Sequence, residues 1–210
     1  MTEHSSLSHE LDRQVANLQR LGYARIAGLS SDAFAQLFEP LRARLGELPA
    51  EAARSEIPFV LVPDPALVPA ARSMPLVEQD GRQGFVDMTP THPGEFAPIE
   101  DVAVPAGAAY LAVDVDTGAE TLNVTPNAAQ ALIDAADRSP LTIEEGIAVL
   151  THHPGILRSR NAFSLLGSRR GDKRVPALWT SKGRPRLGWC WAGNPHTWLG
   201  SASCATRLGA

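Results

Sequence analysis

The segment from Gly188 to Cys204, GWCWAGNPHTWLGSASC, constrains the fold more than any other part of the chain. It contains three of the four Trp and both Cys of the 210 residues. Residues 187–192 have the pattern of a strand, in which successive side chains point to opposite faces. We therefore expect Trp189 and Trp191 on one face of the strand and Cys190 on the other.

A turn and a second strand are predicted next. Gly193, Asn194 and Pro195 form a strong turn signal. Residues 196–202 would then return as a strand with His196 and Trp198 on one face. An earlier strand at residues 175–181, closed by a turn at 182–185, makes the last third of the chain an antiparallel meander.

The rest of the chain is predicted to combine helices with short strands. Apolar residues recur at helical spacing over residues 7–21 and 34–45, where Pro40 predicts a kink or a fresh helix start. Two more helices are expected at 125–138 and 143–152. The second carries a capping box made by Thr142 and Glu145.

Three short stretches have the composition of strands. Residues 57–62 are an apolar run expected to be a buried strand, and residues 76–88 indicate a hairpin around Asp80 and Gly81. Residues 108–115 form a clear strand, which a turn at 116–118 is expected to fold back into 119–124.

These patterns predict an α+β protein with a mainly antiparallel sheet, built from hairpins and a C-terminal meander, packed with about four helices. Residues 1–46 are expected to form an N-terminal helical segment and residues 57–210 an α+β domain. We expect the two to make one compact unit, because 210 residues fit a single domain.

Charge is distributed unevenly along the chain. Residues 1–150 contain 9 Lys and Arg against 22 Asp and Glu, whereas residues 151–210 contain 10 basic residues and one acid, Asp172. Such asymmetry points to an anionic partner, either a small molecule or a nucleic acid. The alternative is that the basic third folds against the acidic remainder and neutralises it.

The basic residues begin before the Trp-rich strand. Six lie close together in the sequence: Arg158, Arg160, Arg169, Arg170, Lys173 and Arg174. Residues 167–172, GSRRGD, resemble an anion-binding turn, because Gly allows close backbone approach and Arg binds phosphate or carboxylate in a bidentate way. The P-loop pattern GxxxxGK[ST] is absent.

The Trp-rich segment has two interpretations. It is either the aromatic core of a sheet or the wall of a ligand pocket, where Trp rings stack on a ligand and Asn194 supplies a donor and an acceptor. The predicted ligand-binding residues are Arg169, Arg170, Arg174, Trp189, Trp191, Asn194 and Trp198.

Two side chains are candidates for catalysis. His196 is able to transfer protons near neutral pH. Cys190 would be a nucleophile only if its pKa were depressed. No arrangement of Cys, His and Asp in the sequence identifies a reaction or a cofactor.

A metal site is a weaker possibility. Cys190, His196 and Cys204 have the spacing C-x5-H-x7-C, but the tight C-x2–4-C pair typical of zinc sites is missing. We therefore assign no metal and keep these three residues as a weak candidate set.

Several features indicate a cytoplasmic location. The chain has no apolar run near 18 residues, its N-terminus lacks the apolar region of a secretory signal, and two Cys do not make a disulfide framework. No membrane partner is expected. Abundant Ala and a large excess of Arg over Lys are typical of a GC-rich bacterial genome.

Three segments resemble an uncharacterised family of bacterial proteins that is catalogued as a domain of unknown function. They are SPLTIEEGIAVLTHHP, FSLLGSRRGDKRVPALW and GWCWAGNPHTWLGSASC. The resemblance covers roughly residues 110 to 207. It implies a cytoplasmic single-domain protein and carries no established activity or catalytic residues.

Three functions therefore stay open. The first is binding, or chemistry, of a small anionic ligand such as a nucleotide or sugar phosphate at the C-terminal Arg, Trp and His side chains. The second is nucleic-acid binding through the same surface, which the acidic body opposes. The third is a structural or interaction protein with an aromatic core. The oligomeric state is not indicated.

Overall fold

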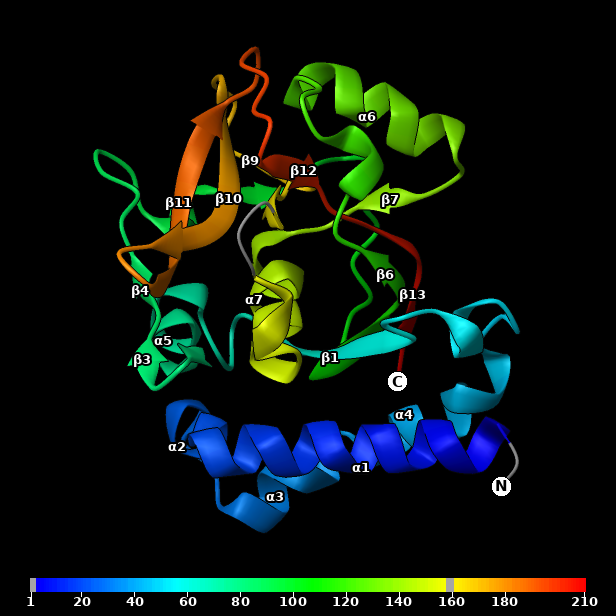
Figure 1. The fold of residues 1–210 in the computed structure, drawn as a ribbon. Coiled ribbons are helices and arrows are strands. Elements are labelled where there is room, and N and C mark those ends of the chain that lie inside the picture. Colours follow the sequence, from blue (N-terminus) through cyan, green and yellow to red (C-terminus); the bar gives the residue numbers. More distant parts are fainter. Residues whose placement is uncertain (1–2, 158–160) are drawn as a thin grey trace.

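The chain folds into a layer of helices and two sheets that lie on either side of a central helix (Figure 1). The computed structural model describes residues 3–157 and 161–210. The predicted α+β class with mainly antiparallel pairing is confirmed.

The helices and strands have the following bounds. The α-helices are α1 (Glu3–Leu21), α2 (Tyr23–Ala27), α3 (Ser31–Gln36), α4 (Glu39–Arg44), α5 (Ala70–Ser73), α6 (Pro126–Ala135) and α7 (Ile143–His152). Turns of 3-10 helix are η1 (Leu45–Glu47), η2 (Ala52–Arg54), η3 (Met74–Leu76), η4 (Pro93–Glu95), η5 (Ala119–Thr121) and η6 (Pro154–Ile156). The strands are β1 (Phe59–Pro63), β2 (Glu78–Gln79), β3 (Arg82–Gln83), β4 (Phe85–Val86), β5 (Ala97–Pro98), β6 (Ala109–Asp116), β7 (Ser139–Pro140), β8 (Ala162–Ser164), β9 (Ser168–Arg169), β10 (Arg174–Ser181), β11 (Arg184–Trp191), β12 (Leu199–Ser201) and β13 (Ser203–Gly209).

The first sheet separates two hydrophobic cores. Its strands pair antiparallel in the order β1-β6-β13-β7. In β1, Phe59 and Leu61 face the core beneath the N-terminal helices, whereas Val60 and Val62 face the core around α7. Because both faces of β1 are covered, every residue of the strand is buried, as the apolar run predicted.

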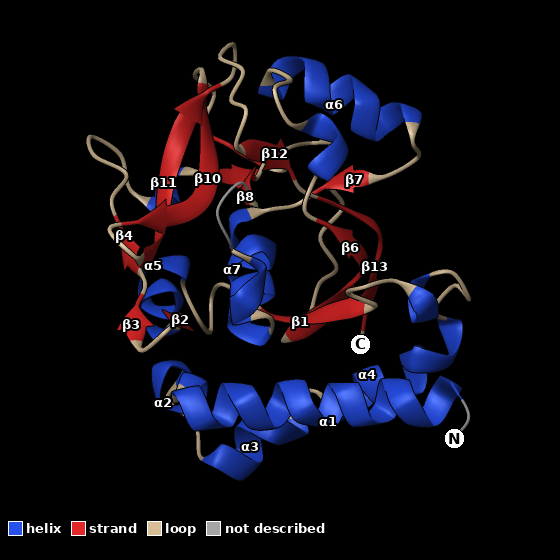
Figure 2. Cartoon of the chain, viewed as in Figure 1, coloured by secondary structure: helices blue, strands red, loops and turns tan. Residues whose placement is uncertain are grey.

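The helices α1 to α4 gather on one side of this sheet (Figure 2). Leu11, Leu18, Phe34 and Phe38 are buried there. The predicted break near Pro40 is confirmed, because α3 ends at Gln36 and α4 begins at Glu39, with proline in its first turn, where a missing N–H costs nothing.

The central helix α7 is anchored at its first turn. Thr142 N donates to Glu145 Oε2 (2.7 Å) and Glu145 N to Thr142 Oγ1 (3.4 Å), which confirms the predicted capping box. The carboxylate of Glu145 also accepts from Arg207 Nε (2.6 Å) on β13 and from the Tyr110 hydroxyl (2.9 Å) on β6. This buried ion pair fixes α7 against the first sheet, and removing either partner would leave an uncompensated charge.

The second sheet has the order β12-β8-β10-β11-β4. The predicted hairpin is present as β10 and β11, with Lys182 and Gly183 at the turn. The predicted meander is wrong at its last step. The return strand β12 pairs in parallel with β8, on the far side of β10, because residues 192–198 carry the chain away from β11 as a loop.

The predicted hairpin over residues 108–124 is also wrong in its second half. β6 pairs with β1 and β13, and residues 119–121 form the 3-10 turn η5. The backbones of Gly118 and Gly200 approach so closely that a Cβ on Gly118 would lie 2.3 Å from Ser201 O. Contact with a strand eighty residues away therefore replaces the local pairing.

The hairpin expected over residues 76–88 is confirmed in part. Asp80 and Gly81 join β2 to β3, as predicted. The following residues leave this hairpin, because β4 pairs in parallel with β11. This pairing brings residues 87–98 next to the Trp-rich strand.

Candidate functional site

The hairpin of β10 and β11 places two of the predicted aromatic residues side by side. Arg174 is paired with Trp191 and Pro176 with Trp189, so these four side chains share one face of the hairpin. The Trp189 and Trp191 rings lie 4.8 Å apart with an interplanar angle of 68°. The prediction that they share a face is confirmed.

The Arg174 guanidinium lies over both rings. Its Cζ is 4.8 Å from the centroid of Trp189 and 5.2 Å from that of Trp191, which is within cation–π range. Its Nη1 pairs with Asp172 Oδ2 at 2.6 Å, and its backbone N–H donates to Asp172 Oδ1 at 2.8 Å. The pKa of Asp172 is held below its usual value by this backbone hydrogen bond and by the side chains of Arg174 and Arg170.

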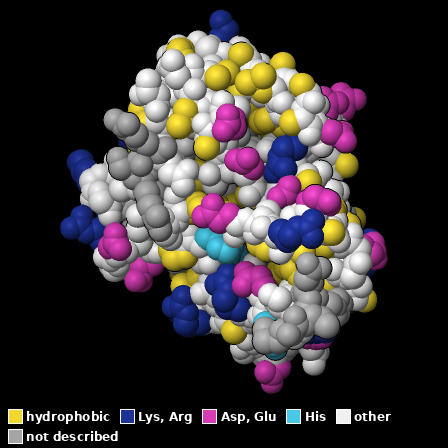
Figure 3. Space-filling view, turned by 45° about the vertical axis from the view of Figure 1, so that its right-hand side comes forward, with side chains coloured by type: hydrophobic (Ala, Val, Ile, Leu, Met, Phe, Trp, Pro, Cys, Tyr) yellow, Lys and Arg dark blue, Asp and Glu magenta, His cyan; other side chains and the backbone are white. Residues whose placement is uncertain are grey.

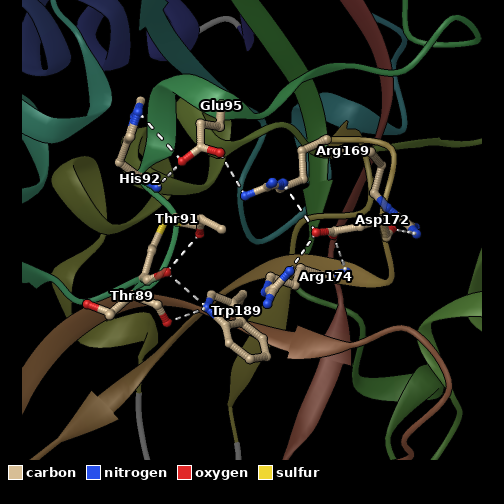
Figure 4. Close-up of polar contacts among 10 residues, drawn as sticks. Thr89, Thr91, His92, Glu95, Arg169, Asp172, Arg174 and Trp189 are labelled. Atoms are coloured by element: carbon tan, nitrogen blue, oxygen red, sulfur yellow. Dashed lines mark hydrogen bonds and ion pairs between the residues drawn. The ribbon is translucent and has the colours of Figure 1, made fainter.

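A chain of ion pairs continues from Asp172 to a second loop (Figure 4). Arg170 lies between Asp172 Oδ2 (3.2 Å) and Glu95 Oε2 (2.7 Å). Glu95 belongs to η4 and also accepts from the backbone N–H of His92 (3.0 Å). The basic turn is thus tied to the loop that follows β4.

The same loop holds Trp189 in place. Its indole Nε1 donates to the carbonyl oxygens of Met88 (3.0 Å) and Thr89 (3.3 Å). The donor of this ring is therefore satisfied within the protein. A ligand would meet the ring through its π face and not through its N–H.

Arg169 is the least engaged of the three predicted arginines. It lies on β9, which pairs with β5, and its Nη2 makes a long contact of 3.4 Å with the carbonyl oxygen of Asp172. The Nε atoms of Arg169 and Arg174 are buried and have no hydrogen-bond partner among the described residues. The Nε atom of Arg186, on the other face of the hairpin, has the same property, so these buried atoms do not mark an anion site.

We call Arg169, Arg170, Arg174, Trp189 and Trp191 the Arg–Trp cluster. Together with Lys173, its cations outnumber the two carboxylates in contact with them, Asp172 and Glu95. The cluster lies on the surface, with Trp191 41% exposed. It does not line any of the five principal hollows in the described parts of the chain. Arg158 and Arg160 lie outside the described residues.

A second aromatic group lies on the opposite face of the same hairpin. Trp179 lies over Gly188, where a Cβ would come within 2.3 Å of its Cη2 atom, and the guanidinium of Arg186 is 4.7 Å from its ring centroid. Trp198 lies 6.3 Å from Trp179, and His196 lies 5.2 Å from Trp198.

The residues predicted as one site are thus divided between two faces. His196 and Trp198 accompany Trp179, whereas Trp189 and Trp191 accompany the arginines. Trp179 and Arg186 were missed in the sequence. The alternation of β10 and β11, with the small Gly188 two residues after Arg186 on the same face, is the signal that would have found them. Asn194 lies exposed in the connecting loop, where its backbone N–H donates to the carbonyl of Trp191 (3.1 Å).

The two cysteines lie in different sheets. Cys190 on β11 packs against the core around α7 and against a smaller apolar cluster that includes Ala129 and Ile133 of α6, and Cys204 on β13 belongs to the core around α7. Burial raises the pKa of each thiol to about 12. A thiol with that pKa is almost entirely protonated at neutral pH, which opposes the role of nucleophile.

The weak zinc candidate set is not assembled. In residues 3–157 and 161–210, no group of three or more His, Cys, Asp and Glu side chains lies close enough to hold a metal ion. Cys190, His196 and Cys204 are therefore not brought together. The reason is that β12 and β13 carry Cys204 into the first sheet, away from β11.

Comparison with known proteins identifies the kinship of the chain. Residues 17–210 match a protein-family model described as a family of unknown function, DUF5701. The chain belongs to this family. The match begins at residue 17, so it includes helices α2 to α4 as well as both sheets, whereas the resemblance seen in the sequence covered only residues 110 to 207.

The other comparisons add no relative. No curated protein and no solved structure matches the chain significantly. Among the helices of the described residues, none is both long and apolar enough to cross a membrane.

Proposed function

We propose that this member of the DUF5701 family binds a small anionic ligand with a planar ring, such as a nucleotide, at the Arg–Trp cluster. The observation that carries the proposal is the position of Arg174, whose guanidinium lies on two indole rings and shares the Asp172 turn with Arg169 and Arg170. Anionic and planar parts of one ligand would meet neighbouring groups of matching chemistry.

The ion pairs already present leave room for such a ligand. Arg170, Arg174 and Asp172 are all partly exposed, with side-chain exposures of 27%, 21% and 32%. Ion pairs near the surface contribute only about 0–1 kcal/mol, so a phosphate would replace one of them at little cost. The arginine fork then binds the phosphate in a bidentate way.

The aromatic part of the site is accessible. Trp191 is 41% exposed, and stacking of a base on such a ring contributes about 1–3 kcal/mol. Its neighbours Trp189 and Arg174 restrict its orientation, which reduces the entropy lost on binding.

A small ligand fits the charge distribution better than a nucleic acid. Residues 1–150 carry 22 acids against 9 basic residues, which repel a long polyanion. On the face seen in Figure 3, acidic and basic side chains are interspersed. We also propose a reducing, cytoplasmic location, because both cysteines are free.

Calorimetric titration with ATP and with ribose 5-phosphate tests the proposal. We expect ATP to bind, and Trp191→Ala and Arg169→Ala each to weaken binding by about tenfold, which corresponds to about 1.4 kcal/mol. The matched controls lie on the opposite face of the hairpin. Trp198 is similarly exposed, at 38%, and Arg186 also lies over a Trp ring.

The controls Trp198→Ala and Arg186→Ala should leave the affinity for ATP unchanged. Equal losses in all four variants would show that binding depends on the stability of the hairpin and not on the Arg–Trp cluster. Absence of ATP binding would contradict the proposal, whether or not ribose 5-phosphate binds.

A further inference from the structure

A separate hollow lies beside η4, and no residue of the Arg–Trp cluster lines it. Its volume is about 450 Å³, within the range of small-molecule sites. Helix α5, η4, β5 and the first turn of α7 surround it. We call it the Glu144 hollow, after a residue of its wall that also lines a smaller hollow beside Tyr23 and Ser73.

The wall of the Glu144 hollow is mostly apolar. Phe96, Val104 and Ala71 line it, together with several prolines. The Tyr110 hydroxyl donates to Glu145 (2.9 Å), and the Thr142 hydroxyl accepts from Glu145 N (3.4 Å). These polar groups are already used within the protein, so the wall offers an anion few donors.

Glu144 is the exception in this wall. It lies in the first turn of α7 and is half-buried. No Lys, Arg or His in the described parts of the chain forms an ion pair with it. His92, at the rim, faces Glu95 at 3.6 Å and its side chain is 73% exposed.

The surroundings of Glu144 disfavour its ionised form. Burial raises the pKa of this carboxyl, and the neighbouring Glu145 and Asp64 raise it further. The charge of Glu145 is balanced by Arg207, whereas no Lys, Arg or His in residues 3–157 and 161–210 forms an ion pair with Glu144. A cation bound in the hollow would stabilise the ionised form of Glu144 and so offset the cost of ionising a carboxyl in apolar surroundings.

We propose that the Glu144 hollow binds a small organic cation, namely a protonated amine carried on an apolar body. The ammonium group donates to the Glu144 carboxylate, and the apolar body packs on Phe96 and Val104. This assignment is independent of the Arg–Trp cluster, which has the opposite charge preference.

Titration with 2-phenylethylamine, and with the neutral 2-phenylethanol as its matched compound, tests the proposal by ligand-observed NMR. We expect the amine to bind at least about tenfold more tightly than the alcohol, the ratio that one charged hydrogen bond provides. Glu144→Gln should remove this preference and leave the weak binding of the alcohol unchanged.

Two further variants complete the design. Ala71→Phe adds a ring at an exposed position of the wall and should abolish binding of both compounds, while a thermal melt shows that the variant is folded. Glu120→Gln, an exposed carboxylate on η5, is the control and should change nothing. Equal affinities for amine and alcohol, unchanged amine binding in Glu144→Gln, or no binding of either compound at millimolar concentration would overturn the proposal.

Discussion

On each face of the β10–β11 hairpin, an Arg lies over a Trp ring and pairs with an Asp, and the two arrangements are nearly the same. On one face Arg174 lies 4.8 Å from the centroid of Trp189 and pairs with Asp172 at 2.6 Å. On the other, Arg186 lies 4.7 Å from the centroid of Trp179 and pairs with Asp87 at 3.0 Å.

The surroundings of the two faces differ. Arg174 has Arg169 and Arg170 beside it, whereas Arg186 is accompanied by aromatic rings, those of Trp198 and His196 beyond Trp179. An Arg stacked on Trp and held by Asp is therefore a structural unit of this hairpin. The second face also has a further arginine, Arg184, which lies over Phe85. The first face differs in the two arginines, Arg169 and Arg170, that gather with Arg174 around Asp172, and these make it the candidate for binding an anion.

The largest expected effect concerns the packing of the second face. Gly188→Ala places a Cβ 2.3 Å from Trp179 Cη2 and 3.2 Å from Asp87 O, and should lower the free energy of unfolding by about 2 kcal/mol. Urea denaturation followed by Trp fluorescence measures this change. Gly193→Ala, where a Cβ meets nothing within 4 Å, is the control and should have little effect.

If Gly193→Ala lowered the free energy of unfolding as much as Gly188→Ala, the hairpin would tolerate no added side chain. The close contact between Trp179 and Gly188 would then not explain the division into two faces.

A smaller effect is expected when the carboxylates are neutralised. Asp172→Asn frees Arg170 and Arg174 from a competing anion and should raise the affinity for ATP about threefold to fivefold. Asp87→Asn makes the same change on the other face and should leave that affinity unchanged. Calorimetric titration compares the two variants. Weaker ATP binding in Asp172→Asn would show that the turn needs its carboxylate to position the arginines.

The smallest effect is a pH dependence of the first face. In the folded protein the pKa of Asp172 is below its usual value of 3.8. The ionised carboxylate therefore stabilises the folded state at pH values above 3.8. This contribution is lost as the pH falls through the lower, folded-state pKa. The melting temperature of the protein should therefore exceed that of Asp172→Asn at pH 7, and the difference should shrink below about pH 4.

Differential scanning fluorimetry between pH 7 and pH 3 checks this expectation. A difference that is constant over the whole range would show that Asp172 acts through its shape and hydrogen bonds, independently of its charge.

Local patterns in the sequence predicted the parts of the candidate site that depend on neighbouring residues. The alternation of Trp189, Cys190 and Trp191 predicted which side chains share a face, and Thr142 with Glu145 predicted where α7 begins. The pleat of a strand and the cap of a helix are decided within a few residues, so a single sequence carries the information.

Other parts were decided only in the tertiary structure. The sequence did not indicate that β12 pairs with β8, that His196 and Trp198 join Trp179, or that Glu144 lines a hollow with Phe96. Each of these depends on contacts between segments far apart in the chain.

The sequence by itself thus determined the fold class, the buried strands, the capped helix and the concentration of positive charge near the Trp-rich strand. The tertiary structure decided how strands pair, which face each ring occupies and which arginines gather beside Trp189 and Trp191. The physical reason is that strand partners are chosen by the total free energy of burial and pairing over both sheets, which no local pattern contains.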